Sequence, residues 1–248
     1  DAIEEAIAHA RVNETDEILA FATSAVRDAS NGAQIIADIN KQYEIDLQVL
    51  SGEDEASMTF LAVRRWLGWS AGNLLVLDIG GGSLEIASGI DENPDATFSI
   101  PLGAARLTRE FLSGDPYNSK GIKSLEKHVE EALKDLLPNA LKSHDADHFV
   151  ATSKTFRTLA RICGQWYGDN SKFLERSSLK SALPRLIEMT NKSRAELPGV
   201  SASRAQQIVA GGVVALAVMD RLDVDEVEIC PWALREGIVL RRLDWLSD

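Results

Sequence analysis

Residues 78–85 read Asp-Ile-Gly-Gly-Gly-Ser-Leu-Glu, and this segment constrains the chain more than any other. It joins two predicted strands, at 74–78 and 84–90, as an antiparallel hairpin. A two-residue hairpin turn needs one or two glycines, whereas three stand here between an acid and a hydroxyl. Glycines permit backbone geometries that side chains forbid, and they let amide N–H groups converge on an anion. The segment therefore favours phosphate binding through Gly80, Gly81, Gly82 and Ser83, and a plain flexible turn is the alternative.

Carboxylates stand close to this corner in the sequence. Asp78 ends the first strand, where it is placed to hold Mg²⁺ directly or through water, and Glu85 lies on the second strand. A further acidic group, residues 53–55, occupies the first turn of a helix predicted to run to about residue 67. These acids suit either favourable contact with the helix dipole or, if one of them faces a cleft, general-base activation of a water.

Two segments combine a strand end, hydroxyl side chains and an arginine one turn later. They are residues 22–28, Ala-Thr-Ser-Ala-Val-Arg-Asp, and residues 151–157, Ala-Thr-Ser-Lys-Thr-Phe-Arg. The carboxyl ends of strands in open α/β sheets are where ligands bind. Arg27 suits bidentate phosphate binding or a surface ion pair. Helix N-caps or phosphate donors are the alternatives for the hydroxyls of Thr23, Ser24, Thr152 and Ser153.

The order of the predicted elements indicates an α/β fold. Short strands at 17–23 and 46–50 alternate with helices at 1–11, 33–42 and 51–67, which predicts a largely parallel sheet. The segment 68–73 is the best candidate domain boundary. Beyond it we expect strands at 96–100, 147–151 and 224–230, and helices at 104–112, 122–137, 152–162 and 232–246. Residues 177–219 are predicted to be mostly helical, interrupted at Pro184 and at Pro198-Gly199.

Composition narrows the functional classes. The 248 residues are 45% hydrophobic and 26% charged, which is ordinary for a folded globular chain and excludes dominant disorder. The longest apolar stretch, 208–219, is about half the length of a membrane span. Two cysteines without a CxxC pair favour a reducing, cytoplasmic setting over disulfides or zinc. The net charge of −12 argues against nucleic-acid binding and makes an anionic substrate depend on a metal or a local basic patch.

Six segments together resemble one family. The chain is similar to the exopolyphosphatase / guanosine-pentaphosphate phosphatase family, which belongs to the actin-like superfamily with sugar kinases and heat-shock chaperones. The matching segments follow the family's order and span most of the chain; they are ATSAVRDA (22–29), LSGEDEA (50–56), LDIGGGSLEI (77–86), PLGAARL (101–107), ATSKTFRTL (151–159) and ALREGIV (233–239).

The resemblance implies two ribonuclease-H-like domains with an active cleft between them. On this basis we expect residues 1–70 plus 232–248 to form the first actin-like domain and residues 71–231 the second. Glu55 matches the family's catalytic base, Asp78 its magnesium-linked aspartate, Glu85 another acidic active-site position, and Gly80 to Ser83 its second phosphate loop. The residues that match phosphate contacts elsewhere in the cleft are Thr23, Ser24, Arg27, Thr152 and Ser153.

One departure is that the family's first phosphate loop, roughly Asp-x-Gly-Ser-Asn, has no match here. The first domain is therefore expected to lack its N-terminal strands. The resemblance implies a Mg²⁺-dependent hydrolase that releases terminal phosphate from inorganic polyphosphate, from guanosine pentaphosphate, or from both, and that forms a homodimer. From the composition we expect it to be cytoplasmic and to bind neither membranes nor nucleic acid. The alternatives are a kinase of the same superfamily and a non-catalytic protein that binds polyphosphate or alarmones.

Overall fold

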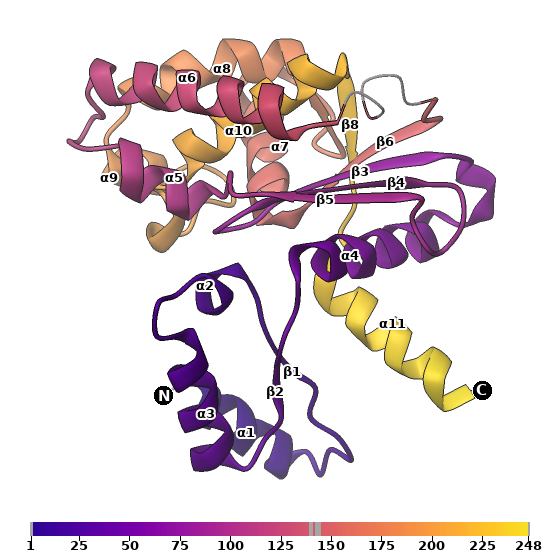
Figure 1. Cartoon of the computed structure of the whole chain (residues 1–248). Helices are drawn as coiled ribbons and strands as arrows, with labels where there is room; N and C mark the ends of the chain where they lie inside the picture. The colour runs from indigo at the N-terminus through magenta and orange to yellow at the C-terminus, as the bar shows by residue number, and fades with distance from the viewer. Residues whose placement is uncertain (1, 139–140, 142–144, 248) are drawn as a thin grey trace. The chain divides into compact units, whose positions relative to one another are not determined.

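The computed structural model describes residues 2–138, 141 and 145–247 (Figure 1). The chain divides into two compact units, Asp1–Ser51 and Gly52–Asp248. The helix expected at 51–67 therefore opens the second unit. The assignment of residues 1–70 plus 232–248 to one domain and 71–231 to another stays a prediction.

The first unit is small and contains two short parallel strands. Strands β1 (Ala20–Ala22) and β2 (Leu47–Val49) pair in parallel. They are confirmed at the predicted places but are shorter than 17–23 and 46–50. The helices of this unit are α1 (Ala2–Val12), α2 (Ser24–Arg27) and α3 (Gly32–Tyr43).

The second unit is built on a six-stranded mixed sheet. Its spatial order is β5-β4-β3-β6-β8-β7. The central strands β3, β6 and β8 are parallel, while β4, β5 and β7 each pair antiparallel with a neighbour. The strands are β3 (Leu74–Ile79), β4 (Leu84–Gly89), β5 (Ala96–Ile100), β6 (His148–Thr152), β7 (Phe173–Glu175) and β8 (Glu226–Ile229).

Helices cover both faces of this sheet (Figure 1). Helix α4 (Gly52–Leu67) lies against β4 and β5, and α11 (Leu234–Ser247) packs against α4. The short 3₁₀ helix η1 (Trp69–Ala71) joins α4 to β3. The opposite face carries α5 (Ala104–Phe111), α6 (Ser119–Leu136), α7 (Ser153–Tyr167), α8 (Arg176–Glu188), α9 (Asn191–Ala195), η3 (Ala202–Arg204) and α10 (Ile208–Leu222).

Strand β3 shows why the sheet needs both layers. Its side chains alternate between two separate hydrophobic clusters, with Leu75 and Leu77 in the large one and Leu74 and Val76 in the small one beneath α4. A strand buried on both faces carries a continuous apolar run, as 74–77 does. This burial fixes the position of Asp78 near the end of the strand.

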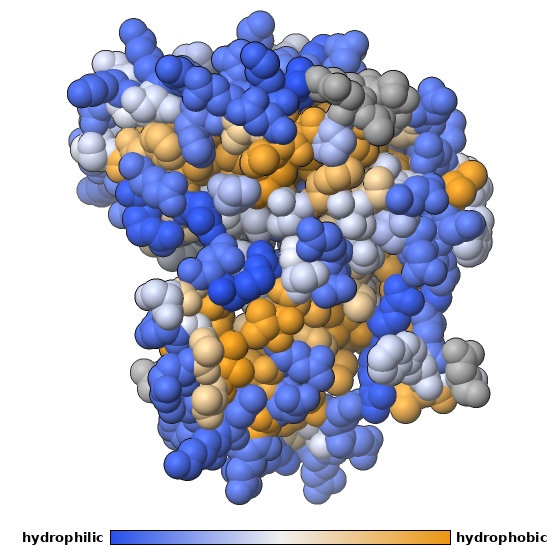
Figure 2. All heavy atoms as spheres, in the orientation of Figure 1, coloured by the Kyte–Doolittle hydropathy of each residue, from blue (hydrophilic) through white to orange (hydrophobic). Residues whose placement is uncertain are grey.

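The apolar side chains are mostly covered. Figure 2 shows hydrophilic side chains over much of the visible surface.

One expectation for the α-helical region is corrected. Pro184 lies inside α8 and does not interrupt it, because the proline is exposed while its neighbours Ala182, Leu183 and Leu186 are buried. Burial of that apolar face outweighs the lost backbone hydrogen bond. Strand β7 was not anticipated. In the part of the chain that the structure describes, no helix has the length and apolar character needed to cross a membrane.

Candidate active site

The segment 80–83, here called the glycine corner, is held by the start of α5. A helix begins with amide groups that have no partner inside the helix. In α5 the N-cap residue, Gly103, has no side chain to satisfy them. The corner supplies the acceptors instead: Ala104 N–H donates to Gly80 O at 3.0 Å, Ala105 and Arg106 N–H donate to Gly81 O at 3.0 and 2.9 Å, and Arg106 Nε donates to Gly82 O at 2.9 Å.

This arrangement orients the other side of the same peptide groups. In a planar trans peptide the carbonyl and the following N–H point in opposite directions. The carbonyls of Gly80, Gly81 and Gly82 face donors from α5, so the N–H groups of Gly81, Gly82 and Ser83 point away from those donors. Within the described residues none of these three N–H groups donates a hydrogen bond. Successive amides of this kind are suited to an anion.

The steric reason for the glycines differs from the sequence expectation. Gly80, Gly81 and Gly82 are not among the described residues with positive φ. A Cβ at Gly80 would meet Ser83 O at 3.5 Å and Glu85 Oε2 at 3.8 Å, and one at Gly81 would meet only Ala105 Cβ at 3.8 Å. These are ordinary contacts, so the second unit itself would accept a methyl group at either position.

The position that strictly requires glycine is Gly103, the N-cap of α5, which packs against the corner. A Cβ there would lie 2.2 Å from Gly82 C and 2.3 Å from Ser83 N. Only glycine lets α5 approach the corner closely enough to donate to its carbonyls. Gly103 was quoted in the family segment 101–107 without a role, and the structure assigns it this one.

Three carboxylates surround the corner. Asp78 and Glu85 are direct cross-strand partners in the β3–β4 pair, which places both side chains on one face of the sheet. Glu85 is buried, and its Oε1 accepts from Ser99 Oγ at 3.0 Å. Glu55, in the first turn of α4, is buried as well and is the third member.

The environment raises the pKa of two of these acids. Burial, followed by the charge of Glu55, raises the pKa of Asp78 to about 6, against smaller lowering effects of Ser153 and Arg157. Burial, followed by the charge of Asp78, raises the pKa of Glu85 to about 8, although hydrogen bonds from Ser83 and Ser99 oppose the shift. The charge of Glu55 thus makes ionisation of both Asp78 and Glu85 harder, as expected for acids that share one site.

The hydroxyl-bearing turns do not cap their helices. Thr23 and Thr152 occupy matching N-cap positions, with φ/ψ of −117°/−162° and −122°/−162°, and neither side chain makes a capping hydrogen bond. The N-cap interpretation of these threonines is therefore wrong. Thr152 Oγ1 instead donates to Trp232 O at 2.7 Å.

Ser153 is the strained residue of the site. Its φ is +75°, a region that costs about 1–3 kcal/mol for a residue with a Cβ. Its Oγ is buried near Asp78, and among the described atoms no hydrogen bond of good geometry holds it. Strain and an unsatisfied buried hydroxyl at one position are typical of a ligand contact.

The predicted site residues thus fall into two groups. Glu55, Asp78, Glu85 and the corner assemble around one another in the second unit, and Ser153 joins them beside Asp78. Thr23, Ser24 and Arg27 belong to the first unit, where Arg27 Nη1 donates to Leu50 O at 2.7 Å. Their contribution to this site stays a prediction.

Arg157, the arginine of the segment 151–157, is a site residue to which the sequence assigned no role. It lies one turn into α7, donates from Nε to Ser153 O at 3.1 Å, and lowers the pKa of Asp78 by its charge. Its spacing from Ser153, four residues along a helix, is the signal that would have placed both on one face.

The donor set suits a hard divalent cation. No group of three or more His, Cys, Asp or Glu side chains in the described residues is arranged to hold a metal ion. Mg²⁺, however, is commonly bound by one or two carboxylates, with water and substrate phosphates completing its shell. Asp78 and Glu85 are two adjacent carboxylates whose raised pKa values a cation would lower again.

The fold and the corner define an α/β protein in which the backbone N–H groups of Gly81, Gly82 and Ser83 lie near a group of carboxylates. The chain belongs to the Ppx/GppA phosphatase family, whose model matches residues 1–245, and the predicted resemblance is confirmed. It is 50% identical over 236 residues to "Exopolyphosphatase 1" of Mycobacterium tuberculosis, covering 94% of this chain and 69% of that protein. "Exopolyphosphatase 1" of Mycobacterium leprae is 48% identical over 236 residues, covering 94% of this chain and 70% of that protein.

Solved structures agree with the fold. An exopolyphosphatase from Cytophaga hutchinsonii superposes with a TM-score of 0.87 at 25% identity, covering 99% of this chain and 80% of that one. The Aquifex aeolicus member of the Ppx/GppA family gives 0.78 at 22% identity, covering 100% of this chain and 80% of that one. The α/β class with a mixed sheet is thereby established.

Proposed function

We propose that this protein is an exopolyphosphatase that hydrolyses the terminal phosphoanhydride bond of inorganic polyphosphate. The observation that carries the proposal is the glycine corner: its carbonyls are occupied by α5, so three adjacent N–H groups remain for the terminal phosphate. The relatives named exopolyphosphatase are 50% and 48% identical to this chain, and they support polyphosphate as the substrate class. Guanosine pentaphosphate, the other substrate type of the resembled family, presents the same terminal group.

Glu55 is proposed as the general base. It takes a proton from a water while the water oxygen attacks the terminal phosphorus, and the bond to the bridging oxygen breaks, leaving a shortened chain and orthophosphate. Phosphoryl transfer needs positioning and charge neutralisation more than covalent help. The corner amides hold the transferred group for this attack, and Ser153 and Thr152 are proposed to add hydroxyl contacts from β6 and α7.

Asp78 and Glu85 are proposed to hold Mg²⁺. When bound, the ion neutralises negative charge on the phosphates and polarises the bond that breaks. In the free protein these two carboxyls keep protons to unusually high pH. Once ionised, Asp78 and Glu85 would hold the cation, and Ser99 and Ser83 fix the orientation of Glu85.

The test compares Glu55→Gln with Glu53→Gln, an exposed acid in the same helical turn. Phosphate release from long-chain polyphosphate and from guanosine pentaphosphate is measured with Mg²⁺ and with a chelator. We expect Glu55→Gln to bind substrate normally and to lose at least about 100-fold in kcat, the usual contribution of a general base, while Glu53→Gln stays near wild type.

Normal turnover by Glu55→Gln would remove Glu55 from its role. Transfer of phosphate from ATP to an acceptor, without release from polyphosphate, would favour the kinase alternative. Tight polyphosphate binding by the wild type without any release would favour the non-catalytic one. Sedimentation of the same samples tests the predicted homodimer.

A further inference from the structure

One buried hydroxyl joins the end of strand β3 to helix α7. Thr155 lies in the first turn of α7 and is 5% exposed. Its Oγ1 donates at 3.0 Å to the carbonyl of Ile79, the last residue of β3. A threonine hydroxyl in a helix often bonds a carbonyl three or four residues earlier in the chain. The hydroxyl of Thr155 instead bonds a strand that lies 76 residues away.

This bond begins where the strand pairing stops. Strands β3 and β6 are parallel, and their register ends at Asp78 and Thr152. Ile79 lies one residue beyond that last pair, at a point where the chain of β6 has already turned into α7. A buried carbonyl without a donor costs free energy comparable to a lost hydrogen bond. Thr155 therefore supplies the donor that β6 no longer provides.

The same bond orients the peptide group at the base of the glycine corner. In a planar trans peptide the C=O and the N–H point in opposite directions. The C=O of the peptide between Ile79 and Gly80 is held by Thr155. Its N–H donates to Ser83 O at 2.9 Å, which closes the corner. Because α5 holds the following three carbonyls, each carbonyl of residues 79–82 accepts a hydrogen bond.

Helix α10 holds the threonine side chain in this orientation. A Cβ at Gly211 would lie 2.5 Å from Thr155 Cγ2 and 3.5 Å from Ala104 Cβ at the start of α5. Glycine thus lets α10 approach the threonine methyl group closely. A β-branched side chain has few χ1 rotamers, so a methyl group packed on α10 leaves the hydroxyl facing β3. Valine would keep the shape but remove the donor, and serine would keep the donor but lose the packed methyl group.

Thr155 also stands two residues after the strained turn of the site. Ser153 has a φ of +75° and a buried Oγ near Asp78. The glycine corner begins two residues after Asp78, directly after Ile79. The hydrogen bond from Thr155 to Ile79 consequently joins the bases of two turns, the corner and the turn between β6 and α7.

We propose that Thr155 is a positioning residue for phosphoryl transfer, because its hydroxyl sets the separation between the glycine corner and Ser153. The inference rests on the proposed function, in which the corner amides hold the terminal phosphate. Thr155 acts through Ile79 and needs no contact with the substrate. A slightly displaced corner still binds a phosphate group but fits the transition state less well, so kcat falls more than KM rises.

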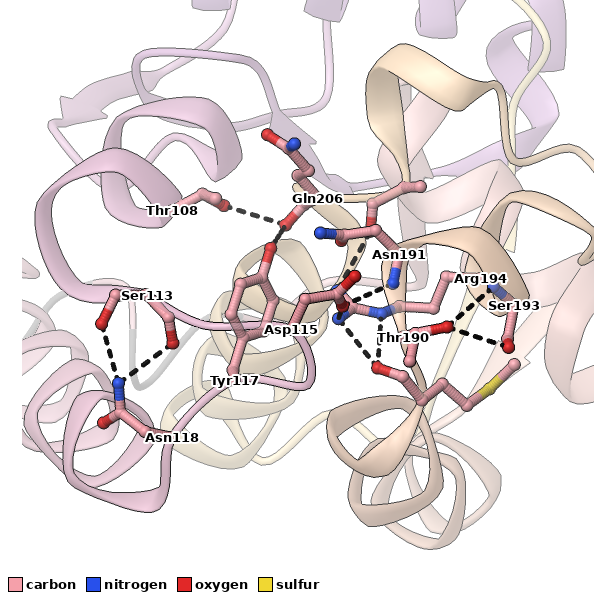
Figure 3. Close-up of polar contacts among 12 residues, drawn as sticks. Thr108, Ser113, Asp115, Tyr117, Asn118, Thr190, Asn191, Ser193, Arg194 and Gln206 are labelled. Atoms are coloured by element: carbon pink, nitrogen blue, oxygen red, sulfur yellow. Dashed lines mark hydrogen bonds and ion pairs between the residues drawn. The ribbon is translucent and has the colours of Figure 1, made fainter.

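The test compares Thr155→Val and Thr155→Ser with the control Tyr117→Phe. Tyr117 Oη donates to Gln206 O at 2.7 Å in the polar network around Arg194 (Figure 3), so the control also loses a hydroxyl bonded to a backbone carbonyl. Phosphate release from long-chain polyphosphate and thermal unfolding are measured for each protein. Thr155→Val is expected to lower kcat by at least about tenfold and to change KM by less than about threefold. Thr155→Ser is expected to recover most of kcat, and Tyr117→Phe to keep it.

Two measurements need no turnover. Amide hydrogen exchange at Gly80, whose N–H is bonded to Ser83 O, is expected to be about tenfold faster in Thr155→Val and unchanged in Tyr117→Phe. Orthophosphate affinity, measured by calorimetry, is expected to weaken in Thr155→Val and to return in Thr155→Ser. Thr155→Ala removes the hydroxyl with less steric demand, is expected to behave like valine, and takes its place if the valine variant does not fold.

These results separate the inference from the proposed function. Wild-type kcat, Gly80 exchange and orthophosphate affinity in a folded Thr155→Val or Thr155→Ala protein would overturn the inference and leave the proposed function standing. Equal losses of kcat in Thr155→Ser and Thr155→Val would also overturn it, because the hydroxyl would not be the cause. If wild type releases no phosphate, the proposed function fails, and the exchange rate and the orthophosphate affinity still decide whether Thr155 positions the corner.

Discussion

Gly103 shows how a single atom governs the proposed phosphate contact. The sequence drew attention to the three glycines of the corner, but none of them has a positive φ, and a Cβ at Gly80 or Gly81 would make only ordinary contacts. Packing within the protein requires glycine at position 103, where a methyl group would overlap Gly82 and Ser83. Sequence alone does not reveal this, since the overlap depends on two segments meeting about 20 residues apart in the chain.

Gly103→Ala is therefore expected to displace the corner. A Cβ 2.2 Å from Gly82 C must move the backbone by about 1 Å, and misplacement on this scale costs on the order of 100-fold in rate. Phosphate release by the variant is measured, together with thermal unfolding to show that the fold persists. Wild-type kcat/KM in a folded Gly103→Ala protein would contradict the proposed geometry.

Glu85 makes stability depend on pH in a definite direction. Its pKa is about 8 in the folded protein, against 4.5 for the free side chain. The folded state thus holds the proton more tightly, and the stabilisation that this provides is complete below pH 4.5 and is lost as the pH rises through 8. Without metal, the free energy of unfolding is expected to fall over this range, by at most about 1.4 kcal/mol per pH unit for one proton.

The measurement is denaturant unfolding between pH 5 and pH 8.5 with a chelator present. Glu85→Gln, which stays neutral throughout, is expected to flatten the pH dependence. Asp78, whose folded pKa is about 6, accounts for part of the remaining slope. A pH dependence in Glu85→Gln as steep as that of wild type would show that Glu85 is ionised in the folded protein.

At the scale of elements, hydrophobic pattern predicted most of the second unit. The runs at 74–78 and 84–90 became β3 and β4, which are buried along nearly their whole length, and the run at 96–100 became β5, which pairs with β4 and buries Ile100. Strand β7 escaped prediction because three residues hold too little pattern; it forms through pairing with β8, far away in the chain. The expectation that Pro184 interrupts the helix was wrong because tertiary contacts, which the sequence does not show, decide which face of a helix is buried.

Helix α10 offers a matched pair of glycine substitutions. At Gly211 a Cβ would lie 2.5 Å from Thr155 Cγ2, on a side chain that also donates to Ile79 O. At Gly212 it would lie 3.0 Å from Leu183 Cδ1, the end of a flexible side chain. Overpacking against the stiff threonine typically costs about 1–3 kcal/mol, whereas alanine at 212 gains helix propensity of up to about 1 kcal/mol.

We therefore expect Gly211→Ala to be less stable than Gly212→Ala by at least about 1 kcal/mol, measured by denaturant unfolding at one pH. Equal stability of the two variants would mean that α7 and α10 adjust more freely than their packing indicates.

For the whole molecule, the sequence identified the chemistry but not its assembly. The acids of α4, β3 and β4 were each named from local motifs, and the family resemblance gave them roles. Their mutual effect on pKa, and the gathering of Lys154, Arg157, Arg161 and Arg204 around one pocket, depend on strand order and helix packing. Residues scattered along a chain show no shared pattern until topology brings them together.

The molecule as a whole is acidic, with a net charge of −12, and its acids converge at the site. Mg²⁺ is consequently expected to stabilise the protein, and more so at pH 8 than at pH 5, because protons compete with the cation for Asp78 and Glu85. At 100 times its dissociation constant the ion would add about 2.7 kcal/mol. Thermal unfolding is followed against Mg²⁺ concentration at both pH values. Asp78→Asn is expected to lose most of this response, while the control Glu53→Gln, which removes an exposed carboxylate from α4, keeps it. A response of equal size at pH 5 and pH 8, or one unchanged in Asp78→Asn, would assign the effect to general screening of negative charge and would take the cation away from these two carboxylates.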